Sequence, residues 1–332
     1  MKISAVACFS NELAIASAFR DQLETFFDKS YLVSHNSYDK TEAIFAGSEL
    51  FEVTVVKDII FRQAELVRSE MVKAFAEGAD WVVLLDFDEF LPFDDRSQFE
   101  KFLSLHSTKD VISWNWQNIF PEQLGHANLF SQPFLTIEGA SSYTKVIISK
   151  SAYEKDPDLV VGHGSHSVNA NRKMVLHNET DLKLIHIPFH GFEHLKQKIM
   201  QRAVLEGATG FFRDFLDVYV STGTFDNEQI KDVALNYCSE VSSKNSPTIF
   251  GFKFPYIKSE YLYEKDSTID SLFATVHTYI LNRDNSEKTL IERELYLEQA
   301  AARAIIQSRS WKITRPLRAA NSALKKFKSL KI

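Results

Sequence analysis

The stretch from Trp81 to Pro92, WVVLLDFDEFLP, places three carboxylates directly after a short apolar run. The run is too short to span a membrane and rich in residues that favour strands, so it predicts a strand buried on both faces. In an extended chain Asp86 and Asp88 point to the same side, and carboxylates about 4 Å apart repel by about 4 kcal/mol at an effective dielectric of about 20. A cation is therefore expected, and oxygen ligands favour Mg²⁺ or Mn²⁺ over Zn²⁺. The alternative is a solvated acidic turn in which Glu89 caps a helix.

Six of the ten histidines fall between residues 163 and 194: His163, His166, His177, His186, His190 and His194. The last three are spaced by four, as on one helical face, but Pro188 would break a helix there. We therefore predict a strand at Leu182–Ile187 and a new helix from about Phe192. A Zn²⁺ site formed by His163, His166 and a third histidine is an alternative that no cysteine supports.

The first 92 residues alternate between apolar runs and amphipathic stretches. The runs predict strands at Lys2–Phe9, Tyr31–Val33, Phe51–Val56 and Trp81–Leu85. Helices are expected at Leu13–Phe27 and along the apolar stripe from Ile60 to Phe75, with Gly78 at its left-handed cap. This order predicts an α/β sandwich with a mostly parallel central sheet. In such sheets ligands bind beyond the carboxyl ends of the strands, where the acidic cluster falls.

The later elements are less regular. The pattern predicts a helix at Ser97–Leu105, strands at Asp110–Trp116 and Ser142–Ser149, and helices near Asn227–Val241 and Lys288–Gln307. These features divide the chain into an α/β domain over 1–212, a mainly helical extension over 213–307 and a basic amphipathic tail over 308–332.

Composition and charge limit the classes of partner. The chain has 332 residues, of which 45% are hydrophobic and 25% charged, as in a soluble globular protein. Eight of its 38 basic residues and no acidic residue lie between Ser308 and Ile332, which leaves 30 basic against 44 acidic residues in the body. An acidic body argues against nucleic acid as a partner. Cys8 and Cys238 offer no disulfide framework, and no secretory signal or transmembrane run is evident, so a cytoplasmic location is expected.

Four ordered motifs resemble family 2-type glycosyltransferases of the GT-A fold. They are FSNE after the first strand, SHNSYDKT after the second, the helix RQAELVRSEMVKAFAEGADW and the strand VVLLDFDEFL. The resemblance covers about residues 1–92 and continues more thinly through TKVIIS, GSHSV and LIHIPFHGFEHLKQKI. The segment SWKITRPLR is similar to a tail of bacterial surface-polysaccharide glycosyltransferases.

This resemblance implies a GT-A fold and a metal-dependent transfer of a hexosyl or related sugar, with inversion. The donor would be a nucleoside diphosphate-sugar, a UDP-sugar as first choice, and the acceptor a glycan or lipid-linked glycan in bacterial polysaccharide biosynthesis. Mn²⁺ or Mg²⁺ would be held by the DxD motif through Asp88, with Asp86 contacting the ribose or the ion through water. A late histidine would be a further ligand, His186 as first choice and His190 as second.

The same resemblance places the nucleotide at the ends of the first strands. Phe9, Asn11 and Glu12 would line the nucleoside pocket, Asp39 matches a later loop acid, and Arg68 matches a helix arginine that approaches the base or phosphate. The loop acid that contacts the base is replaced by Ser34. An exposed helix arginine is the alternative for Arg68.

The general base of an inverting displacement is less evident. Glu138 and His166 are the candidates, and Glu89 is a further option as an acceptor-binding residue. Two other functions are consistent with the DxD motif: a magnesium-dependent phosphatase of the haloacid-dehalogenase type, in which Asp86 would be the nucleophile, and a catalytically silent sugar-binding protein. The cationic, partly apolar tail predicts peripheral contact with the inner face of the plasma membrane, and the alternative is a solvated helix end or an oligomer contact.

Overall fold

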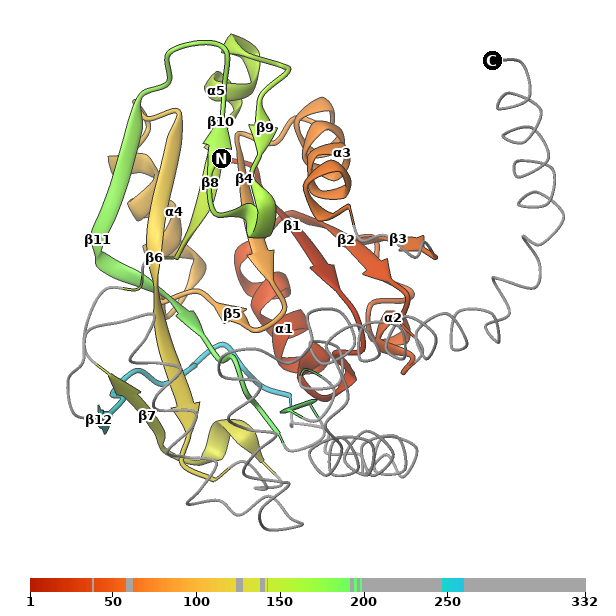
Figure 1. The fold of residues 1–332 in the computed structure, drawn as a ribbon, viewed down its shortest axis with the longest axis vertical. Coiled ribbons are helices and arrows are strands. Elements are labelled where there is room, and N and C mark those ends of the chain that lie inside the picture. Colours follow the sequence, from red (N-terminus) through yellow and green to blue (C-terminus); the bar gives the residue numbers. More distant parts are fainter. Residues whose placement is uncertain are drawn as a thin grey trace, which may run out of the picture.

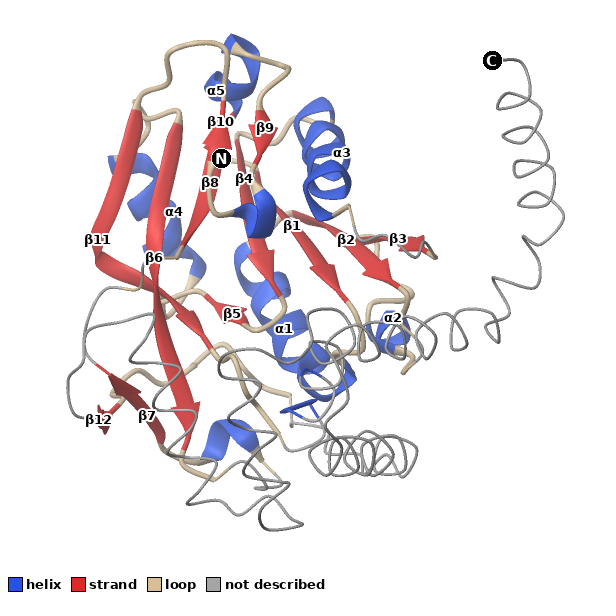
Figure 2. Ribbon diagram, viewed as in Figure 1, coloured by secondary structure: helices blue, strands red, loops and turns tan. Residues whose placement is uncertain are grey.

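The structure is a computed structural model that describes residues 1–37, 39–57, 62–123, 128–137, 141, 143–191, 194–195, 198 and 247–259. Within these residues a ten-stranded mixed sheet carries helices on both faces (Figures 1 and 2). No described helix is long and apolar enough to cross a membrane.

The amino-terminal half of the sheet is parallel. β1 (Ile3–Phe9) lies between β2 (Lys29–His35) and β4 (Trp81–Asp86), and β3 (Phe51–Val56) pairs with β2 at the edge. All seven residues of β1 are buried, because both faces of this strand are covered. Its alternate side chains therefore enter two different cores, which explains why the strand is an unbroken apolar run.

The other half of the sheet contains reversed strands. β8 (Thr144–Ser149) runs antiparallel to both β4 and β6 (Val111–Pro121), and β11 (Leu176–His186) is parallel to β6. β5 (Glu89–Phe90) pairs antiparallel with the end of β11. The remaining strands are β7 (Phe134–Ile137), β12 (Pro247–Ile249), β9 (Val160–Val161) and β10 (Val168–Asn169). The end of β11 is thereby brought next to the turn that follows β4.

Two helical layers cover the sheet. α1 (Leu13–Phe26) and α4 (Arg96–Leu105) bury Phe19, Phe26 and Phe99 in one core, whereas α3 (Gln63–Ala76) buries Val67 and Met71 in the other. The short helices are α2 (Thr41–Ile44), α5 (Lys150–Lys155), η1 (Leu129–Ser131) and η2 (His163–Ser165). The predicted α/β class with a mostly parallel central sheet is confirmed for the described residues.

Several predicted boundaries need correction. The third strand is confirmed at Phe51–Val56, and Gly78 has the expected positive φ of 93°. β6 continues through Pro121, where a loop was expected from Asn118, because its last residues pair with β7. β11 begins at Leu176 instead of Leu182, because a bulge lets the strand continue past its polar residues.

The segment 247–259 joins the same core. β12 pairs with β7, Phe254 and Tyr256 are buried in the cluster that contains α1, and the Tyr256 hydroxyl donates to the Leu91 carbonyl at 2.9 Å. This part of the predicted helical extension therefore contains a strand. The helices predicted near 227–241 and 288–307 and the basic tail lie outside the described residues, and the domain boundaries stay a prediction.

Candidate active site

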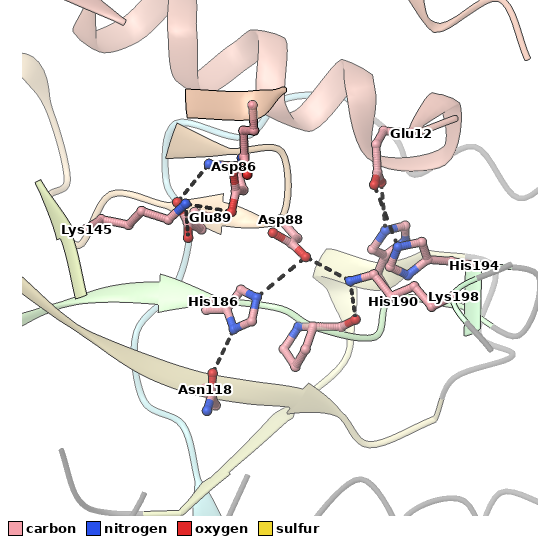
Figure 3. Close-up of polar contacts among 12 residues, drawn as sticks. Glu12, Asp86, Asp88, Glu89, Asn118, Lys145, His186, His190, His194 and Lys198 are labelled. Carbon is pink, nitrogen blue, oxygen red and sulfur yellow. Dashed lines mark hydrogen bonds and ion pairs between the residues drawn. The ribbon is translucent and has the colours of Figure 1, made fainter. Parts of the chain in front are cut away.

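The turn after β4 is the point from which the candidate site is built. Phe87 is buried and packs on Phe19 at a ring-centroid distance of 4.2 Å and on Phe9 at 4.5 Å. This buried ring anchors the turn to the core that contains α1, between the two acids. Asp86 and Asp88 are thereby held at the carboxyl end of β4, in neighbouring but different surroundings (Figure 3).

The first of these surroundings is the Asp86 network, formed by Asp86, Lys145 and Glu89. Lys145 from β8 is fully buried, and its Nζ lies 2.5 Å from Asp86 Oδ2 and 3.3 Å from Glu89 Oε1. Glu89 Oε2 accepts a hydrogen bond from the Asp86 backbone N–H at 2.8 Å. Glu89 lies in β5 and not at a helix start, so the helix-cap interpretation of this residue is wrong.

Burial decides the charge within the Asp86 network. Burial, opposed in part by Lys145 and reinforced by Asp86 and Asp88, raises the pKa of Glu89 well above its usual range. Burial alone would lower the pKa of Lys145, but the adjoining carboxylates outweigh it and raise that pKa. The network therefore places the Lys145 ammonium between two carboxyl groups, and burial favours the neutral form of Glu89.

The second surroundings are the Asp88 network, formed by Asp88, His186, Asn118 and Lys198. Asp88 Oδ2 accepts a hydrogen bond from Lys198 Nζ at 2.9 Å and lies 3.5 Å from His186 Nε2. The Lys198 ammonium also donates to the Pro188 carbonyl at 2.8 Å. Burial alone would raise the pKa of Asp88, but Lys198 and His186 lower it well below its usual range, so Asp88 is ionised.

The His186 ring is fixed by its neighbours on β6. Its Nδ1 lies 2.7 Å from Asn118 Oδ1, and the ring stacks on Trp116 at a centroid distance of 4.1 Å. An amide oxygen can only accept, so Nδ1 carries a proton and Nε2 is the ring atom that faces Asp88. This is the outer-shell arrangement that orients metal-binding histidines in proteins.

The spacing of these two groups fits a shared divalent ion. Ligands about 2.1 Å from one ion lie about 3.0 to 3.4 Å apart, close to the 3.5 Å between His186 Nε2 and Asp88 Oδ2. Asp86 is not part of such a set: among the described residues, the compact sets of three ligand atoms lie elsewhere. The structure thus brings together two of the three predicted metal ligands and turns Asp86 toward Lys145.

Glu12 meets two histidines beside the Asp88 network. Its carboxylate oxygens lie 3.3 Å from His190 Nε2 and 3.7 Å from His194 Nε2, and the two imidazole rings stack at 3.6 Å. Burial, together with His190 and Lys198, lowers the pKa of His194 to about 3, so this ring is neutral near pH 7. These contacts tie the start of the segment that carries Lys198 to the end of β1 (Figure 3).

The other predicted nucleotide residues lie near the ends of β1 and β2, in structural roles. Phe9 is buried, and Asn11 has a positive φ of 58°. Asp39 accepts from the Leu13 backbone N–H at 2.9 Å and from the Thr41 hydroxyl at 2.6 Å, which anchors the start of α1. Their proposed contacts with a nucleotide stay predictions.

Arg68 and His166 lie on the α3 face of the sheet and near β8, respectively. The Arg68 guanidinium donates to the carbonyls of Leu159 at 3.0 Å and Pro157 at 2.9 Å, so it holds this loop against α3. His166 Nδ1 lies 2.6 Å from the Thr144 carbonyl, and burial lowers the pKa of His166, so its ring is neutral near pH 7. Glu138 lies outside the described residues.

Three residues of the site escaped the sequence interpretation: Lys145, Asn118 and Lys198. Lys145 carried a signal, because a charged side chain inside the apolar run TKVIIS must find a partner if it is buried. Asn118 lies just beyond the strand predicted to end at Trp116 and Lys198 within the helix predicted from about Phe192, and neither carries a local pattern that points to the acids.

The comparisons with known proteins find distant similarity. No protein-family model and no curated protein matches the chain. Among solved structures, the chain is similar to S. aureus TarS 1–349, at a TM-score of 0.38 and 12% identity over 74% of both chains. It is also similar to a putative nucleotide-diphospho-sugar transferase from Desulfovibrio desulfuricans G20, at 0.34 and 12% over 72% of this chain and 99% of that one. A third is the complex of Rv0371c from Mycobacterium tuberculosis H37Rv with manganese, at 0.30 and 11% over 59% and 97%.

Proposed function

We propose that the chain is a metal-dependent glycosyltransferase that moves a sugar from a nucleoside diphosphate-sugar to a glycan or lipid-linked glycan, with inversion. The observation that carries the proposal is the pairing of Asp88 with His186 at the carboxyl end of β4, where Asn118 orients the imidazole so that Nε2 faces the carboxylate. This is where ligands bind in open α/β sheets, and the four ordered sequence motifs fit the same function.

The donor set fits a divalent ion. A buried, ionised carboxylate and an oriented imidazole suit Mn²⁺ or Mg²⁺, with further positions left for water and phosphate oxygens. Such an ion would neutralise the charge that develops on the leaving diphosphate. Asp86, held by Lys145, would contact either the ribose or, through a water molecule, the ion.

Lys198 supplies a second positive charge at the same place. Its ammonium donates a hydrogen bond to Asp88 Oδ2 at 2.9 Å, so it would compete with a divalent ion for that oxygen. The side chain is 26% exposed. An ion bound to Asp88 would repel the ammonium toward the open side of the site. In this proposal Lys198 then binds a phosphate oxygen of the donor, where the charge of the diphosphate is greatest.

The donor nucleoside would lie beyond β1 and β2, near Phe9, Asn11, Glu12 and Asp39, with UDP as the first candidate nucleotide. Arg68 would act there by holding the 157–159 loop in place. In this proposal the residues near the ends of β1 and β2 determine which nucleotide binds. The Asp88 network binds the diphosphate and supports sugar transfer.

Among the candidate bases, His166 has the most suitable described surroundings. Glu89 is fully buried beside Lys145, so it is closed to an acceptor hydroxyl. His166 is half-buried and neutral, and its Nδ1 is oriented by the Thr144 carbonyl, which leaves Nε2 as the proton-accepting atom. We propose His166 and Glu138 as the alternative bases.

Calorimetry with UDP, GDP and dTDP, in Mn²⁺ and in EDTA, tests this function. One nucleoside diphosphate should bind in Mn²⁺ and not in EDTA. Asp88→Ala or His186→Ala should abolish this metal-dependent binding. The matched control is Asp94→Ala, because Asp94 is an exposed carboxylate only six residues after Asp88. Binding that is indifferent to both the metal and Asp88 would overturn the proposal.

The two rival functions give different results in the same preparation. Metal-dependent hydrolysis of p-nitrophenyl phosphate that disappears in Asp86→Asn would favour the phosphatase. Nucleotide binding without hydrolysis of any nucleotide sugar or transfer to any glycan would favour the silent binding protein. The pairing of His186 with Asp88 has no role in a phosphatase that uses Asp86 as nucleophile, and for this reason the transferase is preferred.

A lipid-linked acceptor would suit peripheral contact with the inner face of the membrane through residues 308–332. These residues carry eight positive charges and no negative charge, which favours binding to anionic lipid. Removal of this segment should lower binding to anionic liposomes and leave hydrolysis of the donor intact. Unchanged liposome binding would remove the membrane proposal and leave the transferase proposal untouched.

A further inference from the structure

A second group of potential ligands lies at the other end of β11 from His186. His177 and Glu179 lie near the start of β11, on the same face because they are two residues apart. His106 ends α4, which packs on the sheet beside them. His177 pairs with Ile112 and His186 with Asn118, six residues apart on β6, or about 20 Å at 3.3 Å per residue, so this group is separate from the Asp88 network.

The three side chains converge. The rings of His106 and His177 lie 4.1 Å apart between centroids, and His177 Nε2 lies 3.3 Å from Glu179 Oε2. One ligand atom from each residue lies within 4.8 Å of the other two. Four ligands arranged tetrahedrally about 2.05 Å from a Zn²⁺ ion are about 3.3 Å apart, which is the distance seen between His177 and Glu179.

His106 and Glu179 are each oriented by hydrogen bonds with the backbone. His106 Nδ1 lies 2.9 Å from the Phe102 carbonyl one turn earlier in α4, so Nδ1 donates and Nε2 keeps its lone pair. Glu179 Oε1 accepts from the backbone N–H groups of Asp181 at 2.7 Å and Leu182 at 3.1 Å, which the bulge of β11 exposes. The second oxygen, Oε2, is thereby directed to His177.

We propose that His106, His177 and Glu179 form a binding site for a borderline divalent transition-metal ion, Zn²⁺ by its ligand chemistry, that joins the end of α4 to the start of β11. Two imidazoles and one carboxylate form the mixed nitrogen and oxygen set that Zn²⁺ binds well and Mg²⁺ binds poorly. The fixed Nδ1 of His106 and Oε1 of Glu179 are the outer-shell contacts that such sites use.

The surroundings suit an ion with an open coordination position. Burial alone would raise the pKa of Glu179, but the N–H groups of Leu182 and Asp181 and the contact with His177 lower it, so its carboxylate is ionised. The His177 side chain is 29% exposed, which leaves room for a water as the fourth ligand. Because His106 and His177 are 71 positions apart in the sequence, an ion bound to both would link two distant segments and stabilise the fold.

The test is Zn²⁺ binding by the full chain, freed of metal with EDTA and then desalted. Bound zinc is measured by competition with a chromophoric chelator, and the melting temperature is recorded with and without Zn²⁺. His106→Gln, His177→Gln and Glu179→Gln should each lose one equivalent of zinc and the accompanying rise in melting temperature. The affinity loss should exceed the about 10- to 100-fold cost of an outer-shell substitution.

Two controls locate the effect. His163→Gln changes an exposed histidine outside the cluster and should bind zinc as the wild type does. Asp88→Ala should lose metal-dependent nucleotide binding and keep this zinc equivalent, so failure of one proposal is distinguishable from failure of the other. Glu179→Gln keeps an amide oxygen for the two backbone N–H groups, so a loss of zinc in that variant reflects the ligand itself.

The result that would overturn the site is the same zinc stoichiometry and the same rise in melting temperature in all three variants as in the wild type. The cluster would then be an ion pair with a stacked imidazole and nothing more. Should a variant also melt lower without metal, the zinc-dependent increment still decides the question, because it compares each variant with itself.

Discussion

The two acidic networks that follow β4 differ in how their positive charge is held. Lys145 of the Asp86 network is fully buried and comes from the middle of the sheet, whereas Lys198 of the Asp88 network is partly exposed and comes from a segment beyond β11. A buried cation in a strand cannot leave without breaking the fold, but an exposed one can exchange for another cation. The two acids thus differ: Asp86 is in a fixed, buried ion pair, and Asp88 is in an ion pair whose cation is partly exposed.

The largest expected effect is on the Asp86 network. Lys145→Met leaves Asp86 and Glu89 without their buried cation, and we expect a loss of about 3 to 5 kcal/mol in the free energy of unfolding. Urea denaturation measures this loss, and Lys145→Met combined with Asp86→Asn and Glu89→Gln should recover part of it. A loss in Lys145→Met no larger than in Lys150→Met, an exposed lysine of α5, would contradict the distinction between the networks.

The next effect concerns the orientation of His186. Asn118→Ala removes the acceptor that fixes Nδ1, so the imidazole no longer presents Nε2 to Asp88. We expect Mn²⁺-dependent nucleotide binding to weaken by about 10- to 100-fold. The control is Asn115→Ala, on the same strand, whose amide contacts the Ser141 carbonyl instead. Equal affinities of the two variants would show that Asn118 does not support a metal site.

A smaller effect is expected from pH, through the residues that hold the Lys198 segment. The pKa of His194 is lowered from 6.5 to about 3 by burial, with His190 and Lys198 acting in the same direction and Glu12 against them. Below pH 6.5 the unfolded chain therefore binds a proton that the folded chain does not bind until about pH 3. The free energy of unfolding should therefore fall as the pH is lowered from 6.5 toward 3, by at most about 1.4 kcal/mol per pH unit from this group.

His194→Phe removes that contribution and keeps an aromatic ring in the same place. Its stability should fall less steeply than that of the wild type between pH 7 and pH 5, as measured by urea denaturation at intervals across this range. Parallel curves for the two proteins would mean that His194 does not stay neutral in the folded chain.

The smallest effect should come from the exchangeable lysine. Lys198→Met removes an ammonium that competes for Asp88, and charges about 4 Å apart in water interact by about 1 kcal/mol, or a factor of about five in affinity. Mn²⁺ alone should bind about fivefold more tightly, whereas a nucleoside diphosphate in saturating Mn²⁺ should bind less tightly. Changes in the same direction for both ligands would show that Lys198 does not exchange between Asp88 and phosphate.

The sequence predicts the elements that depend on local pattern. The apolar runs of β1, β3 and β4, the amphipathic stripe of α3 and the left-handed Gly78 are visible because each depends on residues within one element. β6 and β11 are longer than predicted, because their polar ends are stabilised by pairing with β7 and by a bulge that no local pattern marks. Tertiary contacts extend strands beyond their propensity.

For the site, the sequence by itself determined that Asp86 and Asp88 end a buried strand on either side of a core phenylalanine, because alternation and an apolar run are local properties. Only the tertiary structure decided what each acid meets. Lys145 is 59 residues from Asp86, Lys198 is 110 residues from Asp88, and Asn118 is 68 residues from His186. Strand order and register bring these partners together, and from this arrangement one carboxylate is fixed by a buried ion pair while the other meets a histidine and a partly exposed lysine.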